Sequence, residues 1–281
     1  MSGKKIVYFP QGSYLGRTAV KSSQGFWYVG DVLDSSDLAY GVLYSGVIEK
    51  EETDLVEKIL KVLFEKGKVN FYDIGANTGY YGILAAWLGQ GKACVYSFEP
   101  QKKYAGCLKE TATINNLAGQ VKIFEYGLGA ENSTATFHLA GSGSSLDASF
   151  LENKNLPTQK IEVKKLDDVI AIEKLGSPDF IKIDVEGFEY KVLQGSKQVI
   201  KSSLPVLFIE IAYSLKAIGR TFTHPDYSGI FNMLKDFGYS PYLSREGRLG
   251  VYDPNRKLDG VNMFLFLHQN KHASLIKQLI L

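Results

Sequence analysis

The fold is decided by the stretch Val69-Asn-Phe-Tyr-Asp-Ile-Gly-Ala-Asn-Thr-Gly79, in which a short apolar run ends in a carboxylate and passes into a glycine-containing turn. An apolar run of β-formers that ends in an acid is typical of a buried parallel strand with a functional group at its C-terminal end. Three more runs end in the same way, at Glu99, Asp184 and Glu210. Ligands of open α/β sheets bind outside these strand ends. We therefore expect the four acids to serve one crevice that holds a polyhydroxylated or cationic ligand.

Strands and helices alternate on both sides of this stretch. We expect strands at 69–74, 93–98, 121–126, 134–139, 160–165, 180–185, 206–211, 239–243 and 262–267, and helices at 49–66, 79–89, 101–116, 166–173, 187–201, 226–237 and 273–281. Regular β–α alternation predicts an α/β fold with a mostly parallel sheet and right-handed crossovers. The last two strands, joined by a polar connection, predict an antiparallel hairpin at one edge. Residues 1–48, in which glycines break short β-like pieces, are expected to form a small β-rich cap ahead of a domain that spans 49–281.

The composition is that of a soluble globular protein. Hydrophobic residues make up 45% of the 281 residues and charged residues 22%. The net charge of +2 indicates no polyanionic partner, so we expect no nucleic-acid binding. No run approaches 18 apolar residues, so we expect no membrane span and take the cytoplasm as the default location. Cys94 and Cys107 are expected to be buried thiols rather than a disulfide. Nothing in the sequence indicates the oligomeric state.

Aromatic residues gather near the N-terminus, outside the alternating pattern. They are Tyr8, Phe9, Tyr14, Phe26, Trp27 and Tyr28. Two interpretations stay open: these side chains form a mini-core inside the cap, or they form an aromatic wall over a substrate cleft.

The turn after the first acid indicates the kind of ligand. A dinucleotide fingerprint needs glycines at 75, 77 and 80, but the chain has Asn77 and Tyr80 there, which disfavours a nicotinamide-dependent oxidoreductase. Glycines in a strand-to-helix turn let the backbone approach a ligand closely. The carboxylate of Asp73 beside this turn suits an ammonium group next to a carboxylate, as in an amino acid. The alternative is a tight turn in which Asp73 binds local backbone.

The second acid extends this interpretation. Glu99 falls 24 residues after Gly75, at the end of the next expected strand. A carboxylate there accepts two hydrogen bonds from vicinal ribose hydroxyls. An amino-acid group and a ribose in adjacent sites describe S-adenosylmethionine. Gly127 and Leu128, after the third strand, are expected near the adenine because small and apolar residues let a ring pack.

The stretch Ile181-Lys-Ile-Asp-Val-Glu-Gly-Phe-Glu-Tyr-Lys-Val-Leu-Gln-Gly195 is the second strong signal. Asp184, Glu186 and Glu189 crowd its strand-to-helix junction. The helix macrodipole accounts for an acid in the first turn, such as Glu189. Clustered carboxylates, however, also raise one another's pKa or bind a cation.

Taken together, these motifs resemble the FkbM family of S-adenosylmethionine-dependent methyltransferases. The resemblance rests on 73–79, 99–100 and 181–195, with Leu166-Asp-Asp-Val and Phe208-Ile-Glu-Ile, and covers roughly 48–268. It implies the class I methyltransferase sheet with strand order 3-2-1-4-5-7-6 and O-methylation of sugars or other hydroxyl-bearing natural products. Motif matching implies the following cofactor contacts: Asp73, Gly75, Ala76, Asn77, Thr78, Gly79, Glu99 and Pro100.

An alcohol is a poor nucleophile near neutral pH, so an O-methyltransferase benefits from a general base. The candidates are Asp184, Glu210 and His224, and we favour Asp184. In the metal-dependent alternative, Asp184, Glu186 and Glu210 bind a magnesium-like ion that lowers the pKa of the acceptor hydroxyl. A catalytically silent binding protein with the same fold is the competing function.

Overall fold

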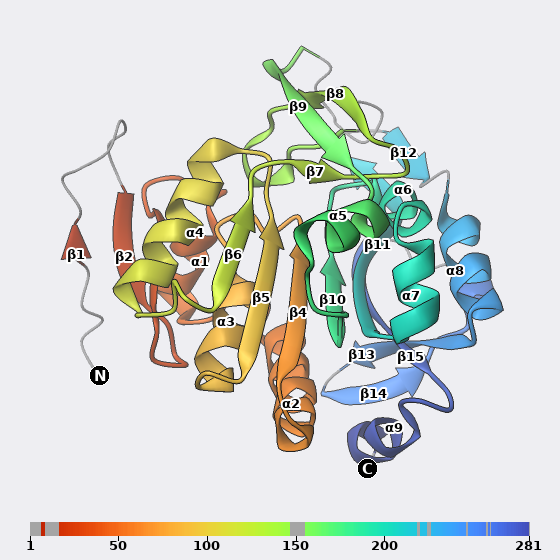
Figure 1. Cartoon of the computed structure of the whole chain (residues 1–281). Coiled ribbons are helices and arrows are strands. Elements are labelled where there is room, and N and C mark those ends of the chain that lie inside the picture. Colours follow the sequence, from red (N-terminus) through yellow and green to blue (C-terminus); the bar gives the residue numbers. More distant parts are fainter. Residues whose placement is uncertain are drawn as a thin grey trace. The chain divides into compact units, whose positions relative to one another are not determined.

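A computed structural model of the chain describes residues 7–8, 17–146, 155–217, 220–223, 226–245, 247–256, 258 and 260–280 (Figure 1). The chain divides into two compact units, Met1–Glu125 and Tyr126–Leu281. The division after Glu125 is not the boundary expected at residue 48 between the cap and the main domain. That boundary stays a prediction.

The first unit begins with a small antiparallel sheet in the order β1 (Val7–Tyr8), β2 (Arg17–Lys21) and β3 (Trp27–Asp31). Helix α1 (Leu38–Ser45) follows, and the sequence did not predict it. Asp37 begins this helix, because its side chain accepts a hydrogen bond from the N–H of Ala39 at 2.9 Å. The segment is therefore β-rich, as expected, and carries one additional helix.

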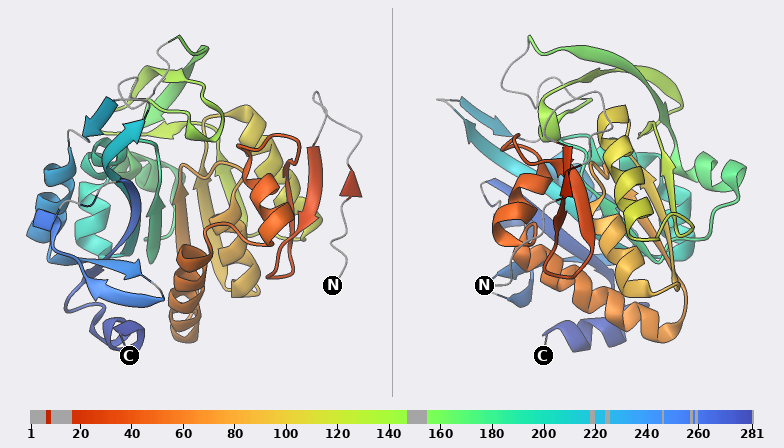
Figure 2. Two further views of the ribbon diagram at one scale, coloured as in Figure 1. Left: turned by 180° about the vertical axis from the view of Figure 1, so that it is seen from behind. Right: turned by 90° about the vertical axis from the view of Figure 1, so that its left-hand side faces the viewer.

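The rest of the first unit alternates between helix and strand. Its elements are α2 (Lys50–Lys66), β4 (Val69–Ile74), α3 (Tyr80–Gly89), β5 (Ala93–Phe98), α4 (Lys102–Ile114) and β6 (Val121–Phe124). Strands β4, β5 and β6 pair in parallel in that order. Helix α3 packs against β4 and β5, whereas α4 packs against β3 and β6. The β2–β3 pair lies over α4 (Figure 2).

The second unit contains a small sheet and the strands of the large sheet from β10 (Phe180–Ile183) onward. Its elements are β7 (Gly127–Leu128), β8 (Ser133–His138), β9 (Thr158–Lys164), α5 (Leu166–Glu173), β10 (Phe180–Ile183), α6 (Glu189–Gln194), α7 (Lys197–Ser203), β11 (Val206–Ala217), β12 (Arg220–Thr223), α8 (Tyr227–Asp236), β13 (Tyr239–Arg245), β14 (Arg248–Val251), β15 (Gly260–His268) and α9 (Ala273–Ile280). The small sheet has the order β7-β9-β8. In the larger one, β10 and β11 are parallel, and β15, β13 and β14 follow antiparallel.

The α/β class with a mixed sheet is confirmed. Strands β4–β6 correspond to the 3-2-1 part of the expected order, and β10, β11, β15 and β13 to the 4-5-7-6 part. The complete order stays a prediction. The helix expected at 187–201 is two helices, α6 and α7, with a break at Gly195 and Ser196. Gly195 is closely packed at this break, since a Cβ there would lie 1.9 Å from the backbone oxygen of Gly129.

Two of the aromatic residues near the N-terminus, Phe26 and Tyr28, belong to the core of the first unit. Phe26 and Tyr28 are completely buried, and their rings lie 5.6 and 5.5 Å from that of Tyr80 on α3. These two side chains therefore form neither a wall over an open cleft nor a core of the cap alone. The side chains of Tyr8, Phe9 and Tyr14 lie outside the described residues.

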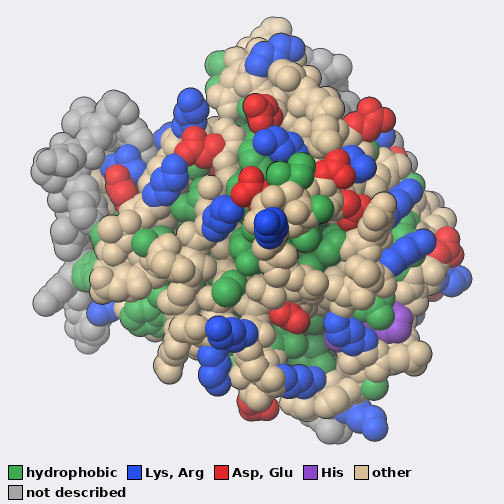
Figure 3. Space-filling model, viewed as in Figure 1, with side chains coloured by type: hydrophobic (Ala, Val, Ile, Leu, Met, Phe, Trp, Pro, Cys, Tyr) green, Lys and Arg blue, Asp and Glu red, His purple; other side chains and the backbone are tan. Residues whose placement is uncertain are grey.

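The two cysteines differ in environment. Both are free thiols, and Cys107 is buried, as expected. Cys94, however, is exposed, because it occupies an outward-facing position in the alternating burial pattern of β5. Among the described residues no helix is long and apolar enough to cross a membrane. Lys, Arg, Asp and Glu side chains are interspersed over the face drawn in Figure 3, in keeping with the nearly balanced charge.

Candidate functional site

The glycine turn after β4 has an unusual backbone. Gly75, Asn77 and Gly79 have φ angles of 75°, 51° and 85°, so three of its residues are left-handed. The N–H groups of Gly75 and Ala76 both donate to the oxygen of Phe98, at 3.1 and 3.0 Å. These bonds hold the turn against the end of β5. The turn leads directly into the N-terminus of α3. A glycine-containing turn of this kind lets backbone approach a ligand closely. That it does so here stays a prediction.

Gly79 is required at its position for two separate reasons. Its left-handed φ disfavours any residue with a side chain, and a Cβ there would lie 2.0 Å from Cδ1 of Leu108 on α4. The glycine thus lets the start of α3 pack directly against α4.

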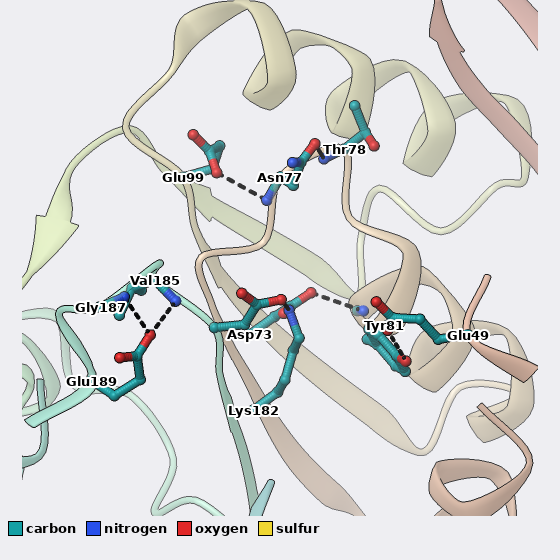
Figure 4. Close-up of polar contacts among 12 residues, drawn as sticks. Glu49, Asp73, Asn77, Thr78, Tyr81, Glu99, Lys182, Val185, Gly187 and Glu189 are labelled. Carbon is teal, nitrogen blue, oxygen red and sulfur yellow. Dashed lines mark hydrogen bonds and ion pairs between the residues drawn. The ribbon is translucent and has the colours of Figure 1, made fainter. Parts of the chain in front are cut away.

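Glu99 is the acid that the turn holds most directly. Its Oε2 accepts the N–H of Asn77 at 2.9 Å and its Oε1 the N–H of Gln101 at 2.7 Å. The side chain is 5% exposed (Figure 4). A carboxylate accepts up to about four hydrogen bonds, so these two fix its orientation without excluding vicinal hydroxyls. Contact between Glu99 and the ribose of S-adenosylmethionine stays a prediction.

Asp73 has a structural partner. It is 1% exposed, and its Oδ2 accepts the N–H of Gly82 in the first turn of α3, at 3.0 Å. This bond to local backbone is the alternative that the sequence left open. Direct contact between Asp73 and a cofactor stays a prediction.

Thr78 is buried, and its hydroxyl is hydrogen-bonded to that of Tyr28 on β3. Its N–H donates to the side-chain oxygen of Asn77 at 2.8 Å. The sequence did not indicate Tyr28 as a functional residue, because 50 positions separate it from Thr78. No local motif signals a contact of that range.

In the second unit three of the predicted acids come together. One carboxylate oxygen each of Asp184, Glu186 and Glu210 lies within 4.8 Å of the others, and the three residues are half-buried. Asp184 also accepts a hydrogen bond from the ammonium group of Lys182, at 2.9 Å. Lys182 is 5% exposed, so its ammonium group is largely removed from water, whereas Asp184 is partly exposed.

Glu210 has an altered protonation equilibrium. Burial of its carboxyl group raises the pKa of Glu210 well above the usual range, and the negative charges of Asp184 and Glu186 raise it further. The cluster therefore retains a proton to a higher pH than an isolated carboxylate would.

A strained turn presents Glu186. Its φ of 53° is left-handed, as is the 94° of Gly187. The buried carboxylate of Glu189 accepts the N–H groups of Val185 and Gly187, both at 3.1 Å (Figure 4). The hydroxyl of Ser145 donates to the backbone oxygen of Glu186 at 2.5 Å. Glu189 thus does more than interact with a helix dipole, and the glycine-serine segment that ends at Ser145 has a structural role that composition did not show.

The other predicted site residues are Gly127, Leu128, Pro100 and His224. Gly127 and Leu128 form β7 in the second unit, and their proximity to an adenine stays a prediction. Pro100 directly follows Glu99 and is half-buried. His224 lies outside the described residues.

Sequence comparison identifies the family. The family model described as methyltransferase FkbM domain matches residues 73–241. A hexuronic acid methyltransferase, AglP, of Haloferax volcanii is 24% identical over 194 residues, which are 67% of either chain.

Solved structures with partial similarity include two methyltransferases. The FkbM methyltransferase of Methylobacillus flagellatus KT is 21% identical with a TM-score of 0.46. The match covers 71% of this chain but 43% of that one, so this chain spans less than half of its length. An O-methyltransferase of Bacillus cereus in complex with SAH is 16% identical with a TM-score of 0.45, over 84% of this chain and 87% of that one. Since the family match covers more than half of the sequence, the chain belongs to the FkbM family of S-adenosylmethionine-dependent methyltransferases.

Proposed function

We propose that this protein transfers the methyl group of S-adenosylmethionine to a hydroxyl oxygen of a sugar or a similar small molecule. The observation that carries the proposal is Glu99, which two backbone N–H groups hold beside the glycine turn. The named activity of the Haloferax volcanii relative supports a sugar as the acceptor.

The first unit binds the cofactor in this proposal. Glu99 receives the ribose hydroxyls, and the turn at 75–79 approaches the amino-acid end. Bound S-adenosylmethionine supplies an activated methyl group, so the main task of the protein is to align the acceptor and exclude water.

The acids of the second unit serve the acceptor. Glu210, with its raised pKa, is a stronger base than an ordinary carboxylate once it has lost its proton. In this proposal Asp184, which accepts a hydrogen bond from Lys182, orients the hydroxyl or shares the proton with Glu210. His224 remains the third candidate for the base.

The decisive experiment combines binding and turnover on the full chain. Calorimetry with S-adenosylhomocysteine tests the cofactor site, and release of S-adenosylhomocysteine from S-adenosylmethionine over a panel of sugars tests transfer. Binding without transfer to any acceptor would favour the catalytically silent alternative. Lack of binding, with NAD bound instead, would overturn the proposal in favour of an oxidoreductase.

Asp184, Glu186 and Glu210 also present the hard oxygen ligands that magnesium prefers. Activity that survives EDTA would assign these carboxylates to proton transfer and acceptor binding. Activity lost with EDTA and restored by Mg²⁺ would assign them to a metal ion.

A further inference from the structure

The N-terminal strand β3 reaches the glycine turn through one buried pair of hydroxyl groups. Tyr28 and Thr78 are each completely buried, and their hydroxyls are hydrogen-bonded. Inside a protein such a bond is shielded from competition with water, and an unpaired buried hydroxyl is unfavourable.

The turn has a reason to need this support. Asn77 holds a left-handed φ of 51° without being glycine, which strains the backbone directly before Thr78. The backbone bonds at Gly75 and Ala76 fix the first half of the turn to Phe98. The bond from Tyr28 fixes the second half, where the chain enters α3.

Tyr28 is itself held rigidly. Its ring packs edge-on against Tyr80, at 5.5 Å between centroids. On either side of it, the N–H of Val29 donates to the hydroxyl of Thr111 on α4 at 3.0 Å, and the N–H of Trp27 donates to Asn115 at 2.8 Å. Strand β3 is thus anchored to the helix that follows Glu99, while Tyr28 reaches the turn that precedes α3.

We propose that Tyr28 is a positioning residue for the cofactor, which holds Thr78 and thereby the turn at 75–79 in the conformation that binds S-adenosylmethionine. The inference rests on the proposed function. It gives the N-terminal segment a part in cofactor binding, although none of the motifs that identify the family lies there.

The test is Tyr28→Phe, which removes the hydroxyl and keeps the ring. Loss of one buried hydrogen bond predicts about 3- to 10-fold weaker binding of S-adenosylhomocysteine. The KM for S-adenosylmethionine should rise by a similar factor, with kcat at saturation little changed, because the bond acts on the loop and not on the reacting atoms.

Tyr239→Phe is the matched control. Tyr239 is also buried, and its hydroxyl donates to the oxygen of Pro205 at 2.8 Å in the second unit. It should lose thermal stability comparably but keep the wild-type affinity. A Tyr28→Phe protein that loses stability and still binds S-adenosylhomocysteine as the wild type does would overturn the inference and leave the proposed function intact.

Thr78→Val removes the same bond from the other side. The double variant should bind no more weakly than Thr78→Val alone, since both changes delete one interaction. Additive losses would overturn the inference. If Tyr28→Phe folds poorly, Thr78→Val alone tests the bond, and wild-type affinity for S-adenosylhomocysteine in that variant would overturn the inference. If the wild-type protein itself fails to bind S-adenosylhomocysteine, the proposed function fails, and the inference fails with it.

Discussion

At the scale of single residues, Gly79 combines a backbone constraint with a packing constraint. We expect Gly79→Ala to lower the free energy of unfolding by about 2–4 kcal/mol, from the left-handed backbone together with the overlap with Leu108. Gly91→Ala is the control, because Gly91 has a φ of 91° with open space around it. Urea unfolding of both variants separates the two contributions. Equal losses of stability in the two variants would show that the side chain of Leu108 moves aside without a cost in free energy.

Glu210 offers a test through pH. Because its pKa is raised in the folded protein, the wild type loses stability as pH rises through that pKa, whereas Glu210→Gln does not. The stability of the variant relative to the wild type should therefore increase with pH above the ordinary carboxyl range. Thermal unfolding across pH measures this difference, and Glu65→Gln, at an exposed site, should show no such trend.

Glu210→Gln should also abolish the limb of the pH–rate profile in which methyl transfer rises with pH, because the base that loses its proton there is removed.

Asp184→Asn should lower turnover and retain the affinity for S-adenosylhomocysteine. Wild-type turnover in Asp184→Asn would remove Asp184 from the mechanism.

At this scale the sequence revealed the acids but not their surroundings. Glu99 and the glycine turn were predictable, because their chemistry is carried by neighbours along the chain. The bonds from Tyr28 to Thr78 and from Ser145 to Glu186 were not, since each depends on tertiary packing between distant segments.

Among the elements, the connection between β10 and α6 shows strain at a candidate site. Glu186 keeps a left-handed backbone that glycine would adopt without strain. Glu186→Gly should therefore raise the free energy of unfolding by about 1 kcal/mol and reduce methyl transfer. Lys174→Gly is the matched control, because Lys174 has a φ of 51° at the exposed end of α5 and should gain stability without losing activity. Full activity in Glu186→Gly would exclude Glu186 from the site.

Element types were predicted well in the alternating part of the chain, including short elements. The strand at 69–74 and the helix at 166–173 coincide with β4 and α5. The break between α6 and α7 was missed, because helical periodicity continues across it. At the break Gly195 lies close to Gly129, a residue far away in the sequence, and such a contact leaves no local signal.

For the whole molecule, ligand binding should appear as stabilisation. At a concentration 100 times its Kd, S-adenosylhomocysteine should add about 2.7 kcal/mol to stability, which corresponds to a rise in Tm of about 5–10 °C for a chain of this size. Differential scanning calorimetry measures the shift. NAD at the same concentration should leave Tm unchanged, and Glu99→Gln should diminish the effect of S-adenosylhomocysteine. A chain whose Tm responds to NAD alone would contradict the assignment of the cofactor.

The packing of β3 on α3 and α4 has an optical consequence. The chain has 2 tryptophans, Trp27 on β3 and Trp87 on α3, and the indole N–H of Trp87 donates to the oxygen of Gln24 at 3.1 Å. Both lie in the first unit, so tryptophan fluorescence, excited selectively at long wavelength, is an intrinsic probe of that unit alone. A Trp27→Phe protein would keep Trp87 as its single tryptophan. Trp87 lies on α3, the helix that follows the glycine turn. Its emission would report cofactor titrations and the docking of β3 without an added label.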